Sequence, residues 1–345
     1  MDNQEIVKLF ITHGFQLSQD ALSLIKNRPE EIISEVEKLK PRPFIITKGH
    51  IEKIIKTHEE KKSPKIILLK EFKFEKKELQ VEDYVKHFIE NYEKIKKILL
   101  KNTKLQKLIS VNKITNNTKE FSLIVSIRDK GKNNLLVEDT TGEIHVFFDE
   151  KIKNKFDLIE VDDIIGLLCD RKKEKIFIND IIYPAISITR KINKTKNEIK
   201  IFYIYKPSLL SDEDFEKLSV VLKKTRKKDP IFVYGEWEDK ERMKNFDNMF
   251  LISDNSFPSI FQLQDVNILI LYKKFISQYI LDKRLIKNNN LLNIFTIDEV
   301  PDIILSSEEK TYFKNYKGST IISNMDQKKY FIINLKTREV EEKKI

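Results

Sequence analysis

The chain is poor in the residues that build disulfide, metal and phosphate-binding sites. Its 345 residues include one cysteine, Cys169, which excludes an intrachain disulfide and a cysteine-cluster zinc site. It has five histidines, and none follows His145. It has seven glycines and no Walker loop, dinucleotide-binding glycine motif or nucleophile elbow. The second half therefore lacks the usual ligands and loops of a metal-dependent or nucleotide-dependent enzyme.

Long apolar segments are also missing. No run of about 18 apolar residues occurs, and residues 1–5 lack the basic and apolar regions of a signal peptide. We therefore expect a cytoplasmic protein without a membrane partner. Hydrophobic residues make up 40% and charged residues 34% of the chain, which is typical of a folded protein with broad solvated surfaces. The length predicts two to three domains.

Positive charge is in excess. The net charge of +10 and the isoelectric point near 9.2 favour an anionic partner, and DNA or RNA is the first candidate. An excess of positive charge is also what we expect of a protein associated with the nucleoid. Heavy use of lysine, isoleucine and asparagine could produce the same charge through composition alone, so the interpretation needs support from a fold.

The first third of the chain predicts a helical domain, a linker and a helix. Apolar residues recur at helical spacing over residues 1–58, which predicts a small helical N-terminal domain. Its histidines, His13, His50 and His58, lie at unrelated spacings and do not indicate a metal site. Residues 59–80 are dominated by Lys and Glu and predict a charged linker with at most a short strand at 66–69. Residues 81–106 predict an amphipathic connecting helix.

Residues 107–192 are rich in short strands separated by turns, which predicts a small sandwich or barrel. A polar insert at 149–156 is compatible with a helix. It lies between the strands expected at 144–148 and 164–168, which are the third and fourth of the five barrel strands that begin at 121. A five-stranded barrel with a connector at that position has the OB topology. The strands are expected at 108–111, 121–127, 135–139, 144–148, 164–168 and 175–182.

The segment from Leu135 to Pro184 resembles the small subunit of archaeal D-family DNA polymerase, which is related to the B subunits of eukaryotic replicative polymerases. The resemblance rests on residues 135–144, 161–166 and 178–184, and extends to the N-terminal helices around 14–21. It implies that residues 199–345 form a reduced calcineurin-like phosphoesterase domain, an α/β sandwich. The expected fold is therefore multidomain α+β, with a helical N-terminal domain, an OB-fold barrel and this sandwich.

The resemblance also places the family's metal-binding positions. Lysine, serine, glutamate or asparagine stands at each of them, and every aligned histidine ligand is gone. Since a lysine repels the cation that such a site holds, the resemblance implies no catalytic residue, no metal and no cofactor in this chain. These positions are Lys206, Ser208, Glu236, Asn255, Ser256, Lys273, Glu308 and Lys310.

The barrel contains candidate nucleic-acid contacts. OB barrels bind single strands by stacking bases on exposed aromatic side chains within a basic groove. Strand alternation can equally place these aromatic residues inside the barrel, in which case the barrel serves as a docking scaffold. The candidates are Lys119, Phe121, Arg128, Lys130, Lys132, Phe147, Phe177, Arg171, Lys172, Lys173 and Lys175.

The sequence therefore predicts a non-catalytic accessory subunit of a D-family-like DNA polymerase. Such a subunit would support replication by binding the large catalytic subunit and DNA, as a heterodimer or larger complex, with the ancestral 3′–5′ exonuclease site lost. One alternative is a stand-alone OB-fold protein that binds single-stranded nucleic acid. Another is an active metal-dependent 3′–5′ exonuclease with an unorthodox site.

Overall fold

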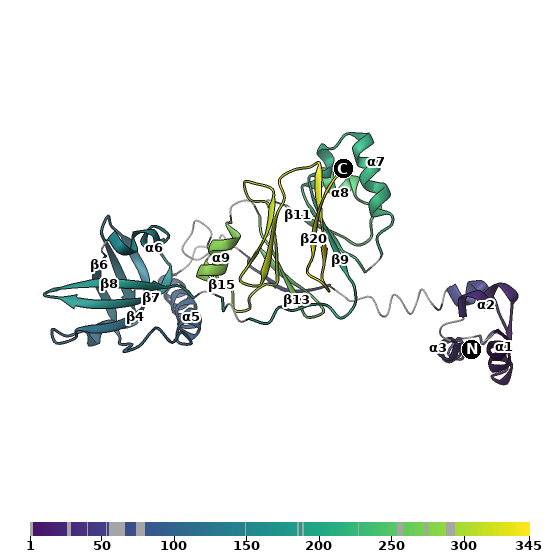
Figure 1. Cartoon of the computed structure of the whole chain (residues 1–345), viewed down its shortest axis with the longest axis horizontal. Coiled ribbons are helices and arrows are strands. Elements are labelled where there is room, and N and C mark those ends of the chain that lie inside the picture. Colours follow the sequence, from purple (N-terminus) through teal and green to yellow (C-terminus); the bar gives the residue numbers. More distant parts are fainter. Residues whose placement is uncertain are drawn as a thin grey trace. The chain divides into compact units, whose positions relative to one another are not determined.

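The computed structural model shows a mixed α/β protein with several sheets and a few helices (Figure 1). The chain forms two compact units, Met1–Lys65 and Ile66–Ile345. Within the described residues, no helix is both long and apolar enough to cross a membrane. The structure describes residues 3–25, 29–39, 41–52, 54, 66–73, 80–148, 150–184, 186–187, 190–226, 228–253, 258–272, 275–287 and 294–345.

The first unit is built from short helices and one small sheet. The helices are α1 (Asn3–Thr12), α2 (Gln19–Ile25) and α3 (Pro29–Val36). Strands β1 (Gln16–Leu17) and β2 (Ile45–Ile46) pair in parallel. Gly14 has a φ of +81° and turns the chain after α1, so that the Phe15 amide donates to the Phe10 carbonyl. The helices share a core of apolar side chains that includes Ile6, Phe10, Phe15, Ala21, Ile25 and Ile51.

Within residues 59–80, where the sequence predicts a charged linker with at most a short strand at 66–69, the structure has a longer strand. Residues Ile66–Glu71 form β3, an edge strand that pairs antiparallel with β12 (Ser259–Leu263). The next residue, Phe72, is buried, and its amide donates to the Pro258 carbonyl over 2.8 Å. The apolar run overrides the charged surroundings because a sheet edge offers backbone partners and a core for Phe72. Residues 55–65 and 74–79, which include His58, lie outside the described part of the chain.

A closed five-stranded barrel follows. Its strand order is β4-β5-β6-β8-β7, and β6 and β8 pair in parallel. The helix α6 (Lys153–Asp157) lies between β6 and β7, where the sequence predicts a helical insert. The turn between β5 and β6 is held by Asp139, whose carboxylate accepts bonds from the Thr141 and Gly142 amides. The strands are Glu120–Lys130, Asn134–Asp139, Gly142–Phe148, Ile164–Lys172 and Lys175–Ile182 for β4 to β8.

Alternate side chains of each strand fill the barrel. In β4 the inward set includes Phe121, Leu123 and Val125, all of them buried. Cys169 of β7 lies in the same core, and burial raises the pKa of its thiol to about 12. The cysteine is therefore a packing residue rather than a reactive one, as its apolar surroundings in the sequence indicate.

The remaining residues form two sheets that face each other across one large core. The five-stranded sheet has the order β11-β10-β9-β19-β20, in which β9, β10 and β11 are parallel. The six-stranded sheet has the order β17-β18-β16-β13-β12-β3. The strands of the first sheet are Met249–Ile252, Ile231–Tyr234, Lys200–Tyr205, Lys329–Asn334 and Val340–Lys344. In the second, β17, β18, β16 and β13 are Tyr312–Tyr316, Ser319–Ser323, Ile303–Ser306 and Val266–Ile270.

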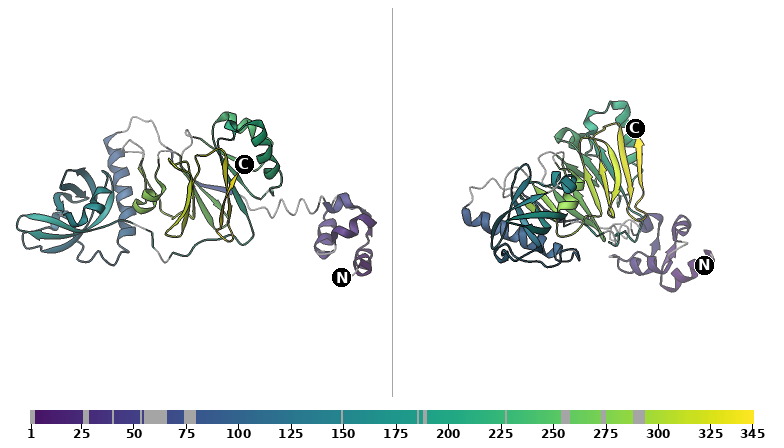
Figure 2. Two further views of the ribbon diagram at one scale, coloured as in Figure 1. Left: turned by 45° about the horizontal axis from the view of Figure 1, so that its top comes forward. Right: turned by 60° about the vertical axis from the view of Figure 1, so that its left-hand side comes forward.

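Helices cover this sandwich. Helices α7 (Asp212–Leu222) and α8 (Trp237–Arg242) pack on the five-stranded sheet through a second apolar cluster that includes Ile204, Leu218 and Met243. Helix α9 (Ser277–Lys283) and the small sheet of β14 (Leu285–Lys287) and β15 (Ile294–Thr296) pack against the large core. Figure 2 shows α7 and α8 on one side of the sandwich and α9 on the other.

The long helix α5 (Val81–Leu99) joins the barrel to the sandwich within the second unit. The Tyr92 hydroxyl donates to the Ile124 carbonyl of the barrel over 2.7 Å, while the Asn91 amide donates to the Ile294 carbonyl over 3.0 Å. Lys283 of α9 adds a buried ion pair to Asp163 at 3.0 Å. The barrel and the sandwich are thus fixed to each other by polar contacts as well as by packing.

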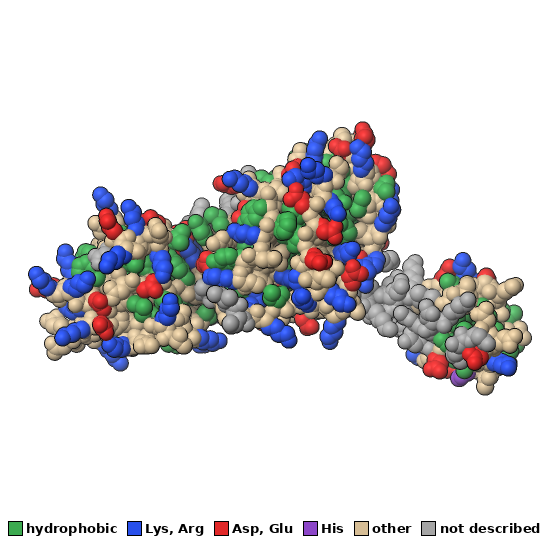
Figure 3. Space-filling view, viewed as in Figure 1, with side chains coloured by type: hydrophobic (Ala, Val, Ile, Leu, Met, Phe, Trp, Pro, Cys, Tyr) green, Lys and Arg blue, Asp and Glu red, His purple; other side chains and the backbone are tan. Residues whose placement is uncertain are grey.

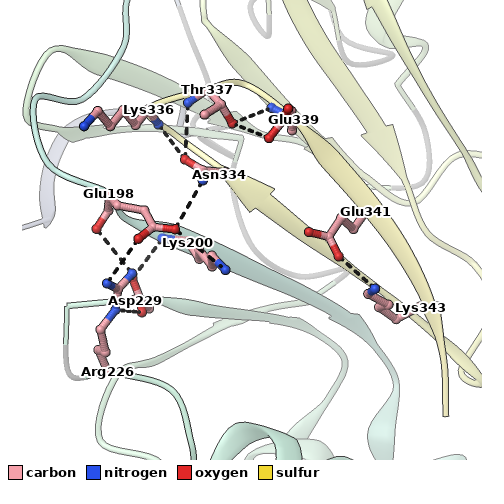
Figure 4. A network of polar contacts seen from close by, with 10 residues as sticks. All are labelled: Glu198, Lys200, Arg226, Asp229, Asn334, Lys336, Thr337, Glu339, Glu341 and Lys343. Atoms are coloured by element: carbon pink, nitrogen blue, oxygen red, sulfur yellow. Dashed lines mark hydrogen bonds and ion pairs between the residues drawn. The ribbon is translucent and has the colours of Figure 1, made fainter.

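A polar network secures the start of β9 at the opposite end of the strand from the candidate site below (Figure 4). The buried Asp229 carboxylate accepts bonds from the Lys200 amide at 2.8 Å and from the Arg226 Nε at 2.7 Å. Arg226 also pairs with Glu198 at 3.6 Å, and Glu198 accepts a bond from Asn334. These contacts tie the loop before β10 to β9 and β19, so they serve the fold.

Candidate functional sites

The carboxyl ends of β9 and β10 meet at one edge of the five-stranded sheet. Tyr205 and Tyr234 are register partners, so the residues that follow them begin neighbouring loops. Lys206 has a φ of +39°, and its amide donates to the Tyr234 carbonyl over 2.6 Å. Three positions that the resemblance assigns to metal binding in the family, Lys206, Ser208 and Glu236, lie at this edge, which we call the strand-end edge.

The buried carboxylate of Asp239 closes the strand-end edge. It accepts bonds from the Ser208 amide and the Glu236 amide, each over 2.7 Å. A Cβ atom on Gly235 would collide with this carboxylate, so the close approach requires glycine. Asp239 therefore binds the backbone of both loops. Sequence reasoning missed it, although the spacing of Glu236 and Asp239 at a helix start is the signal of an N-terminal cap.

Arg242 completes this connection from the last turn of α8. Its Nη1 donates to the Ser208 carbonyl at 2.9 Å and to the Leu210 carbonyl at 2.8 Å. Its Nη2 donates to the Asp212 carboxylate at 2.9 Å. The guanidinium also lies 4.4 Å from the centre of the Phe215 ring. One arginine fork thus fixes the turn η3 (Pro207–Leu209) and the start of α7 against α8.

Glu308, which stands at a family histidine position, has a structural role. Its carboxylate accepts bonds from the Ser277 amide at 3.0 Å and from the Tyr312 hydroxyl at 2.7 Å. Ser277 is the first residue of α9, so the carboxylate stabilises the start of that helix. Burial and the hydrogen bond to Glu308 raise the pKa of the Tyr312 hydroxyl. Lys310 is exposed on the loop that follows.

Aromatic side chains fill the core directly below the strand-end edge. The rings of Tyr205 and Tyr234 are both buried and stack with centroids 5.4 Å apart. The hydroxyl of the buried Tyr203 donates to the Ser306 carbonyl at 2.7 Å, and burial raises its pKa. This part of the sandwich is therefore packed as a core.

The described residues at the family's metal-binding positions do not fit a pair of divalent ions. Such ions require several imidazole and carboxylate ligands together, whereas lysine and serine occupy the β9 loop and Glu308 is already bonded to Ser277 and Tyr312. Among the residues that the structure describes, no three His, Cys, Asp or Glu side chains come together to hold a metal ion. Three predicted positions, Asn255, Ser256 and Lys273, fall outside those residues.

Several predicted nucleic-acid contacts on the barrel are used by the fold. Phe121, one of the candidate stacking residues, is buried because β4 points it into the barrel core. Lys130 donates to the Ile159 carbonyl at 2.7 Å and Arg171 to the Thr115 carbonyl at 3.0 Å. Arg128 pairs with Glu138 at 2.9 Å. These cations secure loops and strands of the barrel.

The other aromatic candidates lie on the outer face of the barrel. Phe147 of β6 and Phe177 of β8 are register partners, half-buried, with ring centroids 6.1 Å apart. The Lys175 Nζ lies 5.0 Å from the centre of the Phe147 ring, and the Lys172 Nζ lies 5.1 Å from that of Phe177. We call these four residues the Phe147–Phe177 platform. Asp170 of β7 is the register partner of Phe177 and lowers the net positive charge of the platform.

Two hairpin turns add further lysines at the platform's end of the barrel. Lys132 lies in the turn between β4 and β5, and Asn134, two residues later, pairs with Phe147. Lys173 lies in the turn between β7 and β8, next to Lys172. Both are exposed, as is Lys119 before β4. Figure 3 shows Lys and Arg side chains spread over the visible face of the barrel, with acidic ones among them.

Comparison with known proteins gives two curated relatives, both named DNA polymerase II small subunit. The protein of Thermoplasma acidophilum is 24% identical over 213 residues, which cover 57% of this chain and 41% of the relative. That of Archaeoglobus fulgidus is 23% identical over 239 residues, which cover 62% of this chain and 48% of the relative. The chain resembles the small subunit of archaeal D-family DNA polymerase. It spans less than half the length of each of these small subunits.

Two further comparisons add nothing to the small-subunit resemblance. No protein-family model matches the chain. A solution NMR structure of a Thermotoga maritima protein is 16% identical and covers 42% of this chain and 99% of its own, with a TM-score of 0.30. A likeness at that level carries no argument about fold.

Asp302, directly before β16, has a clear physical role in this chain. Asp302 is fully buried and forms an ion pair with Arg190. Its carboxylate also accepts bonds from the Asn267 amide at 2.9 Å and from the Asn193 side chain at 3.2 Å. Asp302 thus connects the segment after the barrel to the starts of β13 and β16.

Proposed function

We propose that the chain is a non-catalytic accessory subunit of a D-family-like DNA polymerase. In this proposal the barrel is an OB fold and the sandwich is a reduced calcineurin-like phosphoesterase domain that has lost the 3′–5′ exonuclease site. The observation that carries the proposal is that charged side chains at and near the family's metal-binding positions serve the fold: Asp239 and Arg242 hold the loops of the strand-end edge, and Glu308 holds the start of α9. The names of the two relatives support a small-subunit role.

The proposed mechanism is structural. The second unit offers a rigid body, because α5 and the Lys283–Asp163 pair fix the barrel to the sandwich. Such a body can hold a large catalytic subunit over an extended interface. The Phe147–Phe177 platform would add contacts to a single strand, with an affinity that falls as salt rises.

Co-expression with the large polymerase subunit from the same genome tests this proposal. We expect a complex that elutes as one peak in size-exclusion chromatography at both low and physiological salt, because an obligate interface buries a large apolar area. The chain and the large subunit run separately are the controls. Separate elution of the two proteins at low salt would contradict the proposal.

A second candidate function is a stand-alone single-stranded nucleic-acid-binding protein. The observation that favours it is the same platform, because paired aromatic rings with lysines are what base stacking requires. It would be supported by tight single-strand binding of the chain together with failure to bind the large subunit.

A further inference from the structure

Two large apolar side chains project from the strand-end edge. Leu209, the last residue of η3, is 61% exposed, and Trp237, the first residue of α8, is 62% exposed. Trp237 is the single tryptophan of the chain. The Lys240 Nζ lies 5.1 Å from the centre of its ring. Exposure of a lone leucine is ordinary, whereas a large exposed tryptophan beside it indicates a contact surface.

The backbone that carries both side chains is held firmly. Asp239 accepts a bond from the amide of Ser208, the neighbour of Leu209, and another from that of Glu236, the neighbour of Trp237. Arg242 donates to the carbonyls on both sides of Leu209, those of Ser208 and Leu210. A side chain on a rigid backbone loses little conformational entropy when it binds. Tryptophan is also among the residues that most often dominate binding energy at protein interfaces.

The charge around this pair is negative, in contrast to the chain as a whole. Residues 206–217 and 235–242 contain eight acidic and four basic side chains, whereas the net charge of the chain is +10. The exposed acidic residues include Asp212 and Glu213 at the start of α7 and Glu238 and Glu241 on α8. A nucleic-acid backbone is repelled by such a surface, and a segment with lysine or arginine beside an apolar group is attracted.

We propose that Leu209 and Trp237, with their acidic surroundings, form a docking surface for a basic, apolar segment of the large polymerase subunit. This inference rests on the proposed function and assigns it a location. The strand-end edge would then bind protein, while the Phe147–Phe177 platform on the barrel binds nucleic acid.

The test measures the affinity of the full chain and its variants for the large subunit by biolayer interferometry. Trp237→Ala is expected to raise Kd by about 10- to 30-fold, as for a central interface aromatic, and Leu209→Ala by about 3- to 10-fold. The double variant Glu238→Lys, Glu241→Lys should also raise Kd above that of the wild-type chain, and the increase should be larger at low salt, where charges are screened less. Phe313→Ala is the matched control, since Phe313 is an exposed aromatic of β17 on the other sheet, and it should leave Kd unchanged.

A second readout follows Trp237 itself. With 5-fluorotryptophan incorporated into this chain alone, the fluorine spectrum has one protein resonance, which should shift or broaden on addition of the large subunit and stay unchanged with oligothymidine. Unchanged affinity in Trp237→Ala, with an unchanged melting temperature, would overturn the docking surface while the accessory-subunit proposal stands. Failure of the wild-type chain to bind would overturn both. A shift caused by oligothymidine would assign the surface to nucleic acid instead.

Discussion

Replacing Asp302 with alanine is expected to lower the free energy of unfolding by about 3–5 kcal/mol, as for removal of one partner from a buried ion pair. Asp302 is fully buried, and the substitution leaves the Arg190 guanidinium without its carboxylate. The Asn267 amide loses its acceptor as well. Guanidinium-induced unfolding followed by circular dichroism measures the change.

A second arginine, Arg338, makes the stability of the fold depend more strongly on Asp302. Its Nε and Nη1 are buried without a hydrogen-bond partner, and burial lowers the pKa of its guanidinium to about 10. The Asp302 charge is the main attraction that opposes this effect, while Arg190 adds repulsion. The Asp302 carboxylate therefore balances the positive charges of both Arg190 and Arg338.

Two variants control the Asp302 experiment. Glu120→Ala removes a pair with Lys107 at 2.9 Å in which both side chains are well exposed, and it should change the free energy of unfolding by less than about 1 kcal/mol. Asp302→Asn keeps hydrogen-bond capacity without charge and should fall between the two. Equal stability of Asp302→Ala and Glu120→Ala would show that the buried pair does not support the fold as described.

The double variant Phe147→Ala, Phe177→Ala is expected to weaken binding of oligothymidine by about 30-fold or more, because base stacking contributes roughly 1–3 kcal/mol per base and two rings are removed. Both rings are half-buried on the outer face of the barrel, outside its core. The fold should therefore survive the change. Fluorescence anisotropy of a labelled oligonucleotide measures the dissociation constant.

Salt dependence separates the rings from the lysines of the platform. Lys172→Ala with Lys175→Ala should lower the slope of log affinity against log salt by about 0.7 for each lysine that contacts a phosphate. The double phenylalanine variant should leave that slope nearly unchanged. Phe313→Ala, in the sandwich, is the control for general loss of an exposed aromatic. If both platform variants bind oligothymidine with wild-type affinity, the platform does not contact the nucleic acid.

Local patterns were sufficient to predict much of the second unit. Strand alternation, as in Phe121, Leu123 and Val125, predicts β4, and the helical insert after β6 is present as α6. The mixed α/β character with several sheets is confirmed. These features depend on side-chain periodicity and turn chemistry, which one sequence displays directly.

Features that depend on contacts distant in sequence were not predictable. The apolar run 66–69 predicts at most a short strand, whereas the full length of β3 and the burial of Phe72 depend on β12, nearly 200 residues later. Phe121 and Phe147 look alike in sequence, yet strand register places the first inside and the second outside the barrel. Arg242 left no sequence signal, because its four acceptors are carbonyls and a carboxylate from about 30 residues earlier.

Loss of the exonuclease site is tested by an exonuclease assay on the purified complex of this chain with the large subunit, supplied with primed DNA and with either magnesium or manganese. If the ancestral site is lost, primers are extended when nucleotides are present, and this chain contributes no 3′–5′ shortening when they are absent. Metal-dependent shortening that disappears with Glu236→Ala would contradict that loss, because a carboxylate of the strand-end edge would then serve hydrolysis.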